Sequence, residues 1–321
     1  MTLSERALVL FFMVALTGCA SAAPSAPAAP APVAPAPTAP RAGTAAATPS
    51  ASASPAPWGG RPCGDLDCLA FDTPRLAFER ALMGSPRVIA VGEAHAQKAM
   101  GSVESATRRF ARDLLPVLAP RVKGLVVELL APDRRCEKHE EQAVAERTKP
   151  VTEQQKDTNQ SEFVALGFEA KKLGMRAEPL IPTCDELKSV LGAENDVGAL
   201  LELIANVTVR ETTDFLDHQP PGAAIAIYGG LVHNDATPSP THENWSFGPR
   251  VREHAAGSYV EIDLIVPELV RNEPPWTTLP WYPHYDAQQG GLETRLYRTG
   301  PASFVLIFPR SGGTEAPQVT K

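Results

Sequence analysis

Short apolar segments that end in a glycine and ionisable residues constrain the fold of this chain more than any other feature. Residues 88–95 read Val-Ile-Ala-Val-Gly-Glu-Ala-His, so a β-branched run stops at a glycine and Glu93 and His95 follow at once. A continuous apolar run of this length is typical of a strand buried on both faces of a parallel sheet. Ligands of open α/β sheets bind beyond the carboxyl ends of the strands. The pattern therefore predicts an acid and a histidine where such folds do chemistry.

The same pattern returns further along the chain. Residues 223–228 form a second apolar run, and Gly-Gly-Leu-Val-His follows it and ends at His233. Between the two, residues 124–130 form an apolar strand that carries one charge, Glu128. A carboxylate in an apolar strand needs a partner, because burying it unpaired is costly. We therefore predict one shared site, whose side chains must be paired, metal-bound or shifted in pKa: Glu93, His95, Glu128 and His233.

These segments resemble motifs of a known superfamily. Gly92-Glu93-Ala94-His95, Glu128 and Gly230-Leu231-Val232-His233 resemble the paired Gly-x-x-His motifs and intervening glutamate of the TIKI/TraB group. The Gly-Glu-x-His form is closer to the erythromycin-esterase relatives and the ChaN haem-binding lipoproteins, and the ChaN-like branch is the most similar. The resemblance covers about residues 75–310 and implies an α/β fold with these side chains at one sheet edge. The chain departs from the family at Asn234-Asp235, where a basic residue is expected.

The resemblance implies several activities, because metal-dependent peptidases, esterases and haem-binding proteins all occur in the superfamily. In a hydrolase that uses a divalent transition metal, His95, His233 and one of Glu93 or Glu128 hold the metal, and the other glutamate is the general base. In a metal-free version His95 is the base and a glutamate orients it. The substrate is then an unknown small molecule or peptide. The alternatives are a haem- or small-ligand-binding uptake lipoprotein without catalysis, and a surface domain that has lost its chemistry.

The first 19 residues have the features of an export signal. Arg6 supplies a positive charge, Ala7 to Leu16 supply an apolar core too short to span a bilayer permanently, and Leu16-Thr17-Gly18-Cys19 resembles the bacterial lipobox. Cleavage before Cys19 and lipidation of its thiol are expected to anchor the mature chain to the membrane. No aspartate follows Cys19, so the expected location is the cell envelope, at the outer membrane and facing the periplasm or the exterior.

Composition divides the rest of the chain. Residues 20–57 are almost entirely Ala, Pro, Ser and Thr, which predicts a disordered, semi-extended spacer. Residues 58–311 are long enough for one α/β domain, and residues 312–321 are expected to be a disordered tail. The formal net charge of −7 gives no basic footprint, so we expect no nucleic-acid partner.

Four cysteines besides the lipidated one are expected in the exported chain: Cys63, Cys68, Cys136 and Cys184. They allow three pairings. The first two are close in sequence and are expected to join. The last two each follow a predicted strand, 124–130 or 176–181, so a bridge between them is reasonable if these strands are neighbours. A zinc site is the alternative, although the chain has no Cys-x-x-Cys spacing.

The remaining periodicity alternates between helix and strand. It predicts helices over residues 75–84, 100–118, 161–174 and 196–217, and strands over residues 87–92, 124–130, 176–181, 222–229, 258–265, 292–298 and 302–308. Such alternation predicts a mostly parallel central sheet flanked by helices, with the last two strands forming a C-terminal antiparallel hairpin. The charged segment 132–160 is either a solvated helix with a loop or a mobile lid over the site.

Two loops leave their roles open. His242, in a Pro/Ser/Thr-rich loop after the second motif, either approaches the site or lies apart from it. A later loop is rich in aromatic residues and predicts either a cover over a sheet edge or a wall of the ligand pocket: Trp276, Trp281, Tyr282, His284 and Tyr285.

Cys19→Ser is expected to release the protein from the membrane fraction, because the substitution removes the thiol that carries the lipid. Fractionation of expressing cells followed by immunoblotting measures the release, with Ser21→Ala as the matched control. Unchanged membrane association of the Cys19→Ser variant would contradict lipidation at this residue.

Overall fold

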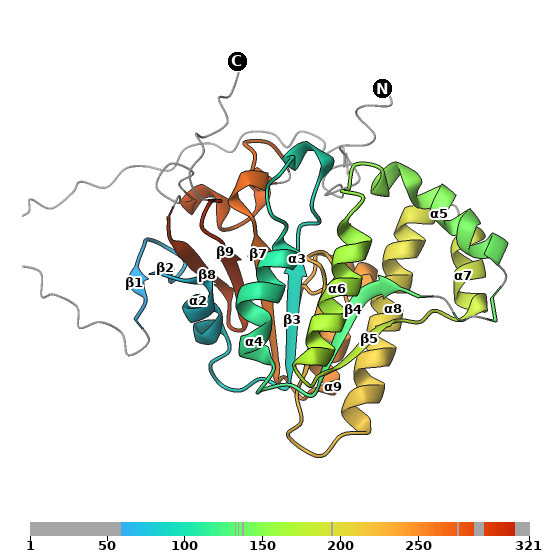
Figure 1. Ribbon diagram of the computed structural model, residues 1–321, viewed down its shortest axis with the longest axis horizontal. Coiled ribbons are helices and arrows are strands. Elements are labelled where there is room, and N and C mark those ends of the chain that lie inside the picture. Colours follow the sequence, from blue (N-terminus) through green and yellow to red (C-terminus); the bar gives the residue numbers. More distant parts are fainter. Residues whose placement is uncertain are drawn as a thin grey trace, which may run out of the picture.

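A computed structural model of the protein describes residues 59–311, apart from residues 132, 134, 137, 194, 275 and 286–291. The expected signal sequence, Cys19, the spacer and the tail lie outside the described residues. Within them, the predicted α/β class is confirmed, because helices pack on both faces of one nine-stranded, mostly parallel sheet (Figure 1). No helix of this described part combines the length and the apolar character needed to cross a membrane.

The sheet places its parallel strands at the centre and its antiparallel strands at one side. From that side its order is β1 (Arg61–Pro62), β2 (Leu69–Phe71), β8 (Thr294–Gly300), β9 (Ser303–Ile307), β7 (Tyr259–Ile265), β3 (Val88–Glu93), β6 (Ile225–Gly230), β4 (Gly124–Leu130) and β5 (Arg176–Leu180). The strands from β9 to β5 are parallel, whereas β1, β2 and β8 pair antiparallel with their neighbours. The predicted C-terminal hairpin is therefore confirmed as β8 and β9.

The two faces of the sheet carry separate hydrophobic cores. The helices are α2 (Pro74–Ala81), α3 (Ala106–Arg109), α4 (Leu115–Leu118), α5 (Lys138–Thr152), α6 (Asn159–Lys172), α7 (Cys184–Leu191), α8 (Asp196–Asp217) and α9 (Gly248–His254). Ile89 of β3 belongs to the core that includes Phe163 of α6, and Val88 of β3 to the core that includes Val207 of α8. Successive side chains of a strand point to opposite faces. A strand covered on both sides has no polar face, which explains the continuous apolar run of β3.

Helix boundaries follow the caps and the proline. The helix α8 has the predicted bounds, and Asn195 caps it by accepting the N–H of Gly198 at 3.1 Å. The helix predicted over residues 100–118 is wrong in its first part, because α3 begins only at Ala106. Between α3 and α4 the chain makes a π-helical turn over Phe110–Leu114, and Pro116 is the second residue of α4. Proline has no N–H to donate and disturbs the preceding turn, which accounts for this irregularity.

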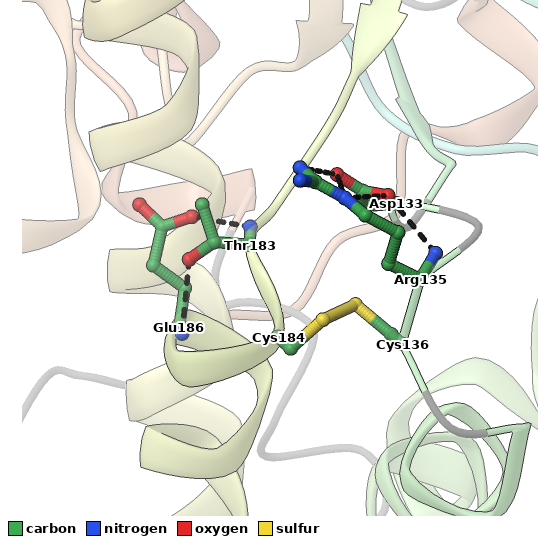
Figure 2. The surroundings of a disulfide bond; sticks show 6 residues. All are labelled: Asp133, Arg135, Cys136, Thr183, Cys184 and Glu186. Carbon is green, nitrogen blue, oxygen red and sulfur yellow. Dashed lines mark hydrogen bonds and ion pairs between the residues drawn. A yellow bond between two sulfur atoms is a disulfide. The ribbon is translucent and has the colours of Figure 1, made fainter.

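Two disulfides join the four cysteines in the described part of the chain, Cys63 with Cys68 and Cys136 with Cys184. Because β4 and β5 are neighbours, the cysteines that follow them lie within reach of each other. Figure 2 shows the second bridge at the start of α7. Thr183 caps this helix, since its hydroxyl accepts the N–H of Glu186 at 3.3 Å while the Glu186 carboxylate accepts the N–H of Thr183 at 2.7 Å.

Removing the disulfides is expected to cost unequal amounts of stability, because a bridge that closes a longer loop restricts the unfolded chain more. The bridged residues are 48 positions apart for Cys136–Cys184 and 5 for Cys63–Cys68. Replacing both partners by serine should lower the free energy of unfolding by about 4 kcal/mol for the first pair and about 2 kcal/mol for the second. Urea unfolding of both double variants without reductant checks this, and equal or reversed losses would contradict it.

Candidate functional site

The structure brings Glu93, His95, Glu128 and His233 together at the carboxyl ends of β3, β4 and β6. The Nε2 atom of His95 lies 3.7 Å from Oε1 of Glu128, and the Nε2 atom of His233 lies 3.8 Å from the same oxygen. Both are ion-pair distances and are too long for hydrogen bonds. One carboxylate oxygen is thus faced by two imidazoles from segments more than a hundred residues apart in the chain.

Glu93 contacts the His95 ring at its Nδ1 atom. Its Oε1 atom lies 2.9 Å from Nδ1 of His95. Its Oε2 atom accepts hydrogen bonds from the hydroxyls of Thr107 at 3.0 Å and Tyr228 at 3.1 Å. Glu93 is only 2% exposed, and these three partners occupy both of its oxygens. The geometry therefore makes Glu93 a residue that orients His95, and the Nε2 atom of the ring points toward Glu128.

His233 is oriented by a backbone carbonyl. Its Nδ1 atom lies 2.6 Å from the carbonyl oxygen of Trp245. A carbonyl only accepts hydrogen bonds, so Nδ1 carries the proton and, in the neutral ring, Nε2 keeps the lone pair. The turn is fixed as well, because the N–H of His233 donates to the carbonyl of Gly230 at 3.0 Å. The two histidines therefore share one carboxylate but have different partners behind them.

The glycines of the motifs give the site its room. A Cβ atom on Gly229 would lie 2.3 Å from Oε2 of Glu128, and one on Gly92 would lie 2.7 Å from the Cα atom of Leu231. In the observed arrangement the N–H of Gly230 donates to Oε2 of Glu128 at 2.6 Å. Glu128 thus has the partners that a carboxylate in an apolar strand requires: one backbone amide and two imidazoles.

Neighbouring groups shift the pKa values of His95 and Glu128. Burial opposes the imidazolium of His95, but Glu128 and Glu93 outweigh it and raise the pKa of His95 to about 10. Burial also opposes the carboxylate of Glu128, but His233, His95 and the amide of Gly230 outweigh it and lower the pKa of Glu128 to about 2. At neutral pH, His95 is therefore an imidazolium held between two carboxylates.

Part of the segment that the sequence marks as a solvated helix or a lid is tied to the loop after His95. The N–H of Lys98 donates to the carbonyl of Gln154 at 3.0 Å, and the N–H of Lys156 donates to the carbonyl of Ala96 at 2.8 Å. The side chain of Asn159 also donates to Ala96, at 3.1 Å. We call residues 153–159 the strap. It links α5 and α6 and fixes the backbone beside His95.

A second buried polar cluster lies beside the site, and the sequence analysis did not identify it. Asn234 donates to Oδ1 of Asp263 at 3.0 Å, and the carboxylate of Glu261 accepts from the N–H of Ala236 and the hydroxyl of Ser303, both at 2.9 Å. Burial, opposed by the N–H of Ala236, raises the pKa of Glu261 to about 7, and burial also raises that of Asp263. The signal in the sequence is the two charges, Glu261 and Asp263, inside the strand predicted over residues 258–265.

The loop that carries His242 and the loop rich in aromatic residues both lie outside the group of four ionisable side chains. His242 stacks on Trp245 with ring centroids 4.8 Å apart, so it packs behind the carbonyl that orients His233. Trp281 is 2% exposed and packs against Tyr297 of β8 at 6.5 Å between centroids. Trp281 of the aromatic loop thus covers the side of the sheet that carries β8.

Whether these side chains can hold the expected metal ion depends on which of their donor atoms are available. Among the residues that the structure describes, no group of three or more His, Cys, Asp or Glu side chains is arranged to hold a metal ion. Both Nδ1 atoms, both oxygens of Glu93 and Oε2 of Glu128 are engaged by protein partners. The atoms that converge are Nε2 of His95, Nε2 of His233 and Oε1 of Glu128. As arranged, these side chains do not form a metal site, and we assign no step to a metal.

The comparisons with known proteins leave the family open. The chain matches no family model and no curated protein. Two solved structures are similar. The MARTX toxin effector domain RRSP from Vibrio vulnificus CMCP6 is 14% identical, with a TM-score of 0.29, and the match covers 50% of this chain and 31% of that one. The type III effector HopBA1 is 10% identical, with a TM-score of 0.37, over 74% and 94% of the two chains. Similarities this weak leave the function to be argued from the site.

Glu93→Gln is expected to flatten the loss of stability at high pH. A raised pKa means that His95 stabilises the fold fully below about pH 6.5 and loses this contribution as the pH rises through about 10. Without the Glu93 charge the pKa of His95 falls, so between pH 7 and pH 10.5 the variant should lose roughly 1–2 kcal/mol less than the wild type. Urea unfolding across this range measures the difference. Glu79→Gln, which removes an exposed pairing with Arg75, is the control, and an equally steep decline in the Glu93→Gln variant would contradict the assignment.

Proposed function

We propose that this chain is a hydrolase whose centre is formed by His95, Glu128 and His233, with Glu93 as a positioning residue. One observation carries the proposal: two imidazole Nε2 atoms face the same carboxylate oxygen at 3.7 and 3.8 Å, and each ring is fixed from behind through Nδ1. General acid–base catalysis needs imidazoles held in one tautomer and one orientation. The resemblance of the motif segments to erythromycin-esterase relatives is consistent with this reaction class.

The unequal surroundings of the two rings assign their roles. His95, between two carboxylates, holds its proton and acts as the general acid that protonates the leaving group. His233 donates to a carbonyl through Nδ1, so in the neutral ring its Nε2 atom has the lone pair that a general base requires. This assignment differs from the metal-free expectation, in which His95 is the base, because the charges around His95 favour its protonated form.

The proposed reaction hydrolyses an ester or amide bond. Nε2 of His233 takes a proton from a water molecule as the water oxygen attacks the carbonyl carbon. Glu128 stabilises the imidazolium that forms, since it is an anion 3.8 Å away. When the bond to the leaving group breaks, His95 gives its proton to the departing oxygen or nitrogen. Lipidation at Cys19, if it anchors the domain as proposed, places this reaction at the surface of an envelope membrane.

The activity is tested with p-nitrophenyl acetate and with a mixture of quenched fluorogenic peptides, in metal-depleted buffer. His95→Ala and His233→Ala should each lower kcat/KM by about 10²–10⁴-fold, the usual contribution of a general acid or base. His218→Ala is the matched control, because this histidine is exposed on the surface and its side chain is 72% exposed. Circular dichroism confirms that each variant is folded.

The same samples separate the alternatives. Hydrolysis that disappears with a chelator and returns with zinc or manganese would replace the metal-free mechanism by a metal-dependent one. No hydrolysis of either substrate class, or full activity in both histidine variants, would contradict the hydrolase proposal. A Soret shift on titration with haemin in an otherwise inactive protein would favour the haem-binding alternative.

A further inference from the structure

Arg295 has a buried nitrogen atom without a hydrogen-bond acceptor. The residue is 8% exposed, and among the residues that the structure describes none accepts a hydrogen bond from its Nε atom. Arginine is almost never this buried unless it is paired, because an uncompensated charge inside a protein is costly. Arg295 therefore has the features of a residue that pairs with a bound ligand.

The position of Arg295 relates it to the candidate site. Arg295 pairs with Ile307 of β9, which is the last residue of that strand. The next residue of β8, Leu296, begins a row of register partners across four strands. The row consists of Leu296, Leu306, Leu264 and Glu93. Arg295 thus lies at the same edge of the sheet as the histidines, where β8, β9, β7 and β3 stand side by side (Figure 1). Three strand spacings separate β8 from β3, which amounts to about 14 Å.

A second buried polar group lies near Arg295. The hydroxyl of Tyr285 interacts with the side chain of Arg310, and no residue in the described part of the chain accepts its proton. Burial raises the pKa of Tyr285, while the guanidiniums of Arg310 and Arg295 act in the opposite direction, so both lie close to this hydroxyl. A phenolic hydroxyl and two guanidiniums are all hydrogen-bond donors. Their shared surroundings favour an acceptor with negative charge.

Glu268 is an acid near Tyr285, but it pairs with other residues. Glu268 acts electrostatically on Tyr285, but its Oε1 atom accepts the N–H of Ser311 at 2.6 Å. Its Oε2 atom has no hydrogen-bond donor among the described residues and lies 3.6 Å from the guanidinium of Arg109. Glu268 is therefore paired with the backbone of Ser311 and with Arg109 of α3, and the described part of the chain shows no ion pair between Glu268 and Arg295.

We propose that Arg295, together with the hydroxyl of Tyr285, binds an oxyanion: a carboxylate or phosphate group of a ligand at this edge of the sheet. The planar guanidinium presents two N–H groups that match two oxygens of such a group, and the tyrosine hydroxyl supplies a further donor. A ligand that also reaches the histidines carries its anionic group about 14 Å from Glu93. The oxyanion site concerns which ligands the domain selects, so it does not depend on the proposed hydrolysis.

The site is tested by binding of inorganic phosphate and of acetate to the full-length folded protein. Isothermal titration calorimetry and thermal unfolding at constant ionic strength provide two readouts, because a ligand that binds only the folded state raises Tm with its concentration. Phosphate, acetate or both should bind the wild type, and comparing them shows which oxyanion the site takes. Arg295→Gln should weaken binding at least tenfold. Arg298→Gln is the matched control on the same strand, since Arg298 is exposed and pairs with Asp67 at 3.7 Å.

Stability without ligand separates a binding role from a structural one. In anion-free buffer Arg295→Gln should leave Tm unchanged or raise it, because the variant removes a buried charge. Tyr285→Phe should weaken binding severalfold with no change in Tm, and it tests the site even if the arginine variant does not fold. Failure of both anions to bind the wild type, or equal binding by wild type and both variants, would overturn the proposal. These outcomes are measured without any substrate, so they are distinct from a failure of the hydrolase assay.

Discussion

A carboxylate buried at the end of an apolar strand, Glu128, fixes the geometry around it. Its charge is compensated by the N–H of Gly230 at 2.6 Å and by imidazoles at 3.7 and 3.8 Å. The amide is available only because β4 and β6 are neighbours, and the approach is possible only because Gly229 has no side chain. Glu93 is also a buried carboxylate that needs hydrogen-bond donors, and the hydroxyls of Thr107 and Tyr228 supply them.

Much of the fold follows from patterns that are local in the sequence. The apolar runs identify β3, β4 and β6, because strands covered on both faces have no side that carries polar residues. The bounds predicted for α8 agree with the structure, since a long helix with an Asn cap and one apolar face is a strong signal. The short elements α7, α9, β1 and β2 were missed. With two to eight residues each, they owe their conformation to tertiary contacts more than to their own sequence.

The four ionisable residues of the site could be named from the sequence, but their roles could not. Glu93, Glu128 and both histidines each stand out against an apolar run. What distinguishes them is the partner behind each ring, and one of these partners is the carbonyl of Trp245, a group that every residue carries. No sequence pattern marks such an acceptor. The buried pair Glu261 and Asp263 was missed because an alternating strand such as β7 also fits an ordinary half-exposed strand.

The order of strands in the sheet has a consequence for how the chain reaches its native state. The strand β6 follows β3 and β4 in the chain but lies between them in the sheet. While the polypeptide emerges from the ribosome, the facing edges of β3 and β4 therefore have no neighbour until residue 230 has been made. Open strand edges can pair with other chains, so the late synthesis of β6 leaves the nascent protein exposed to such pairing until this strand is complete.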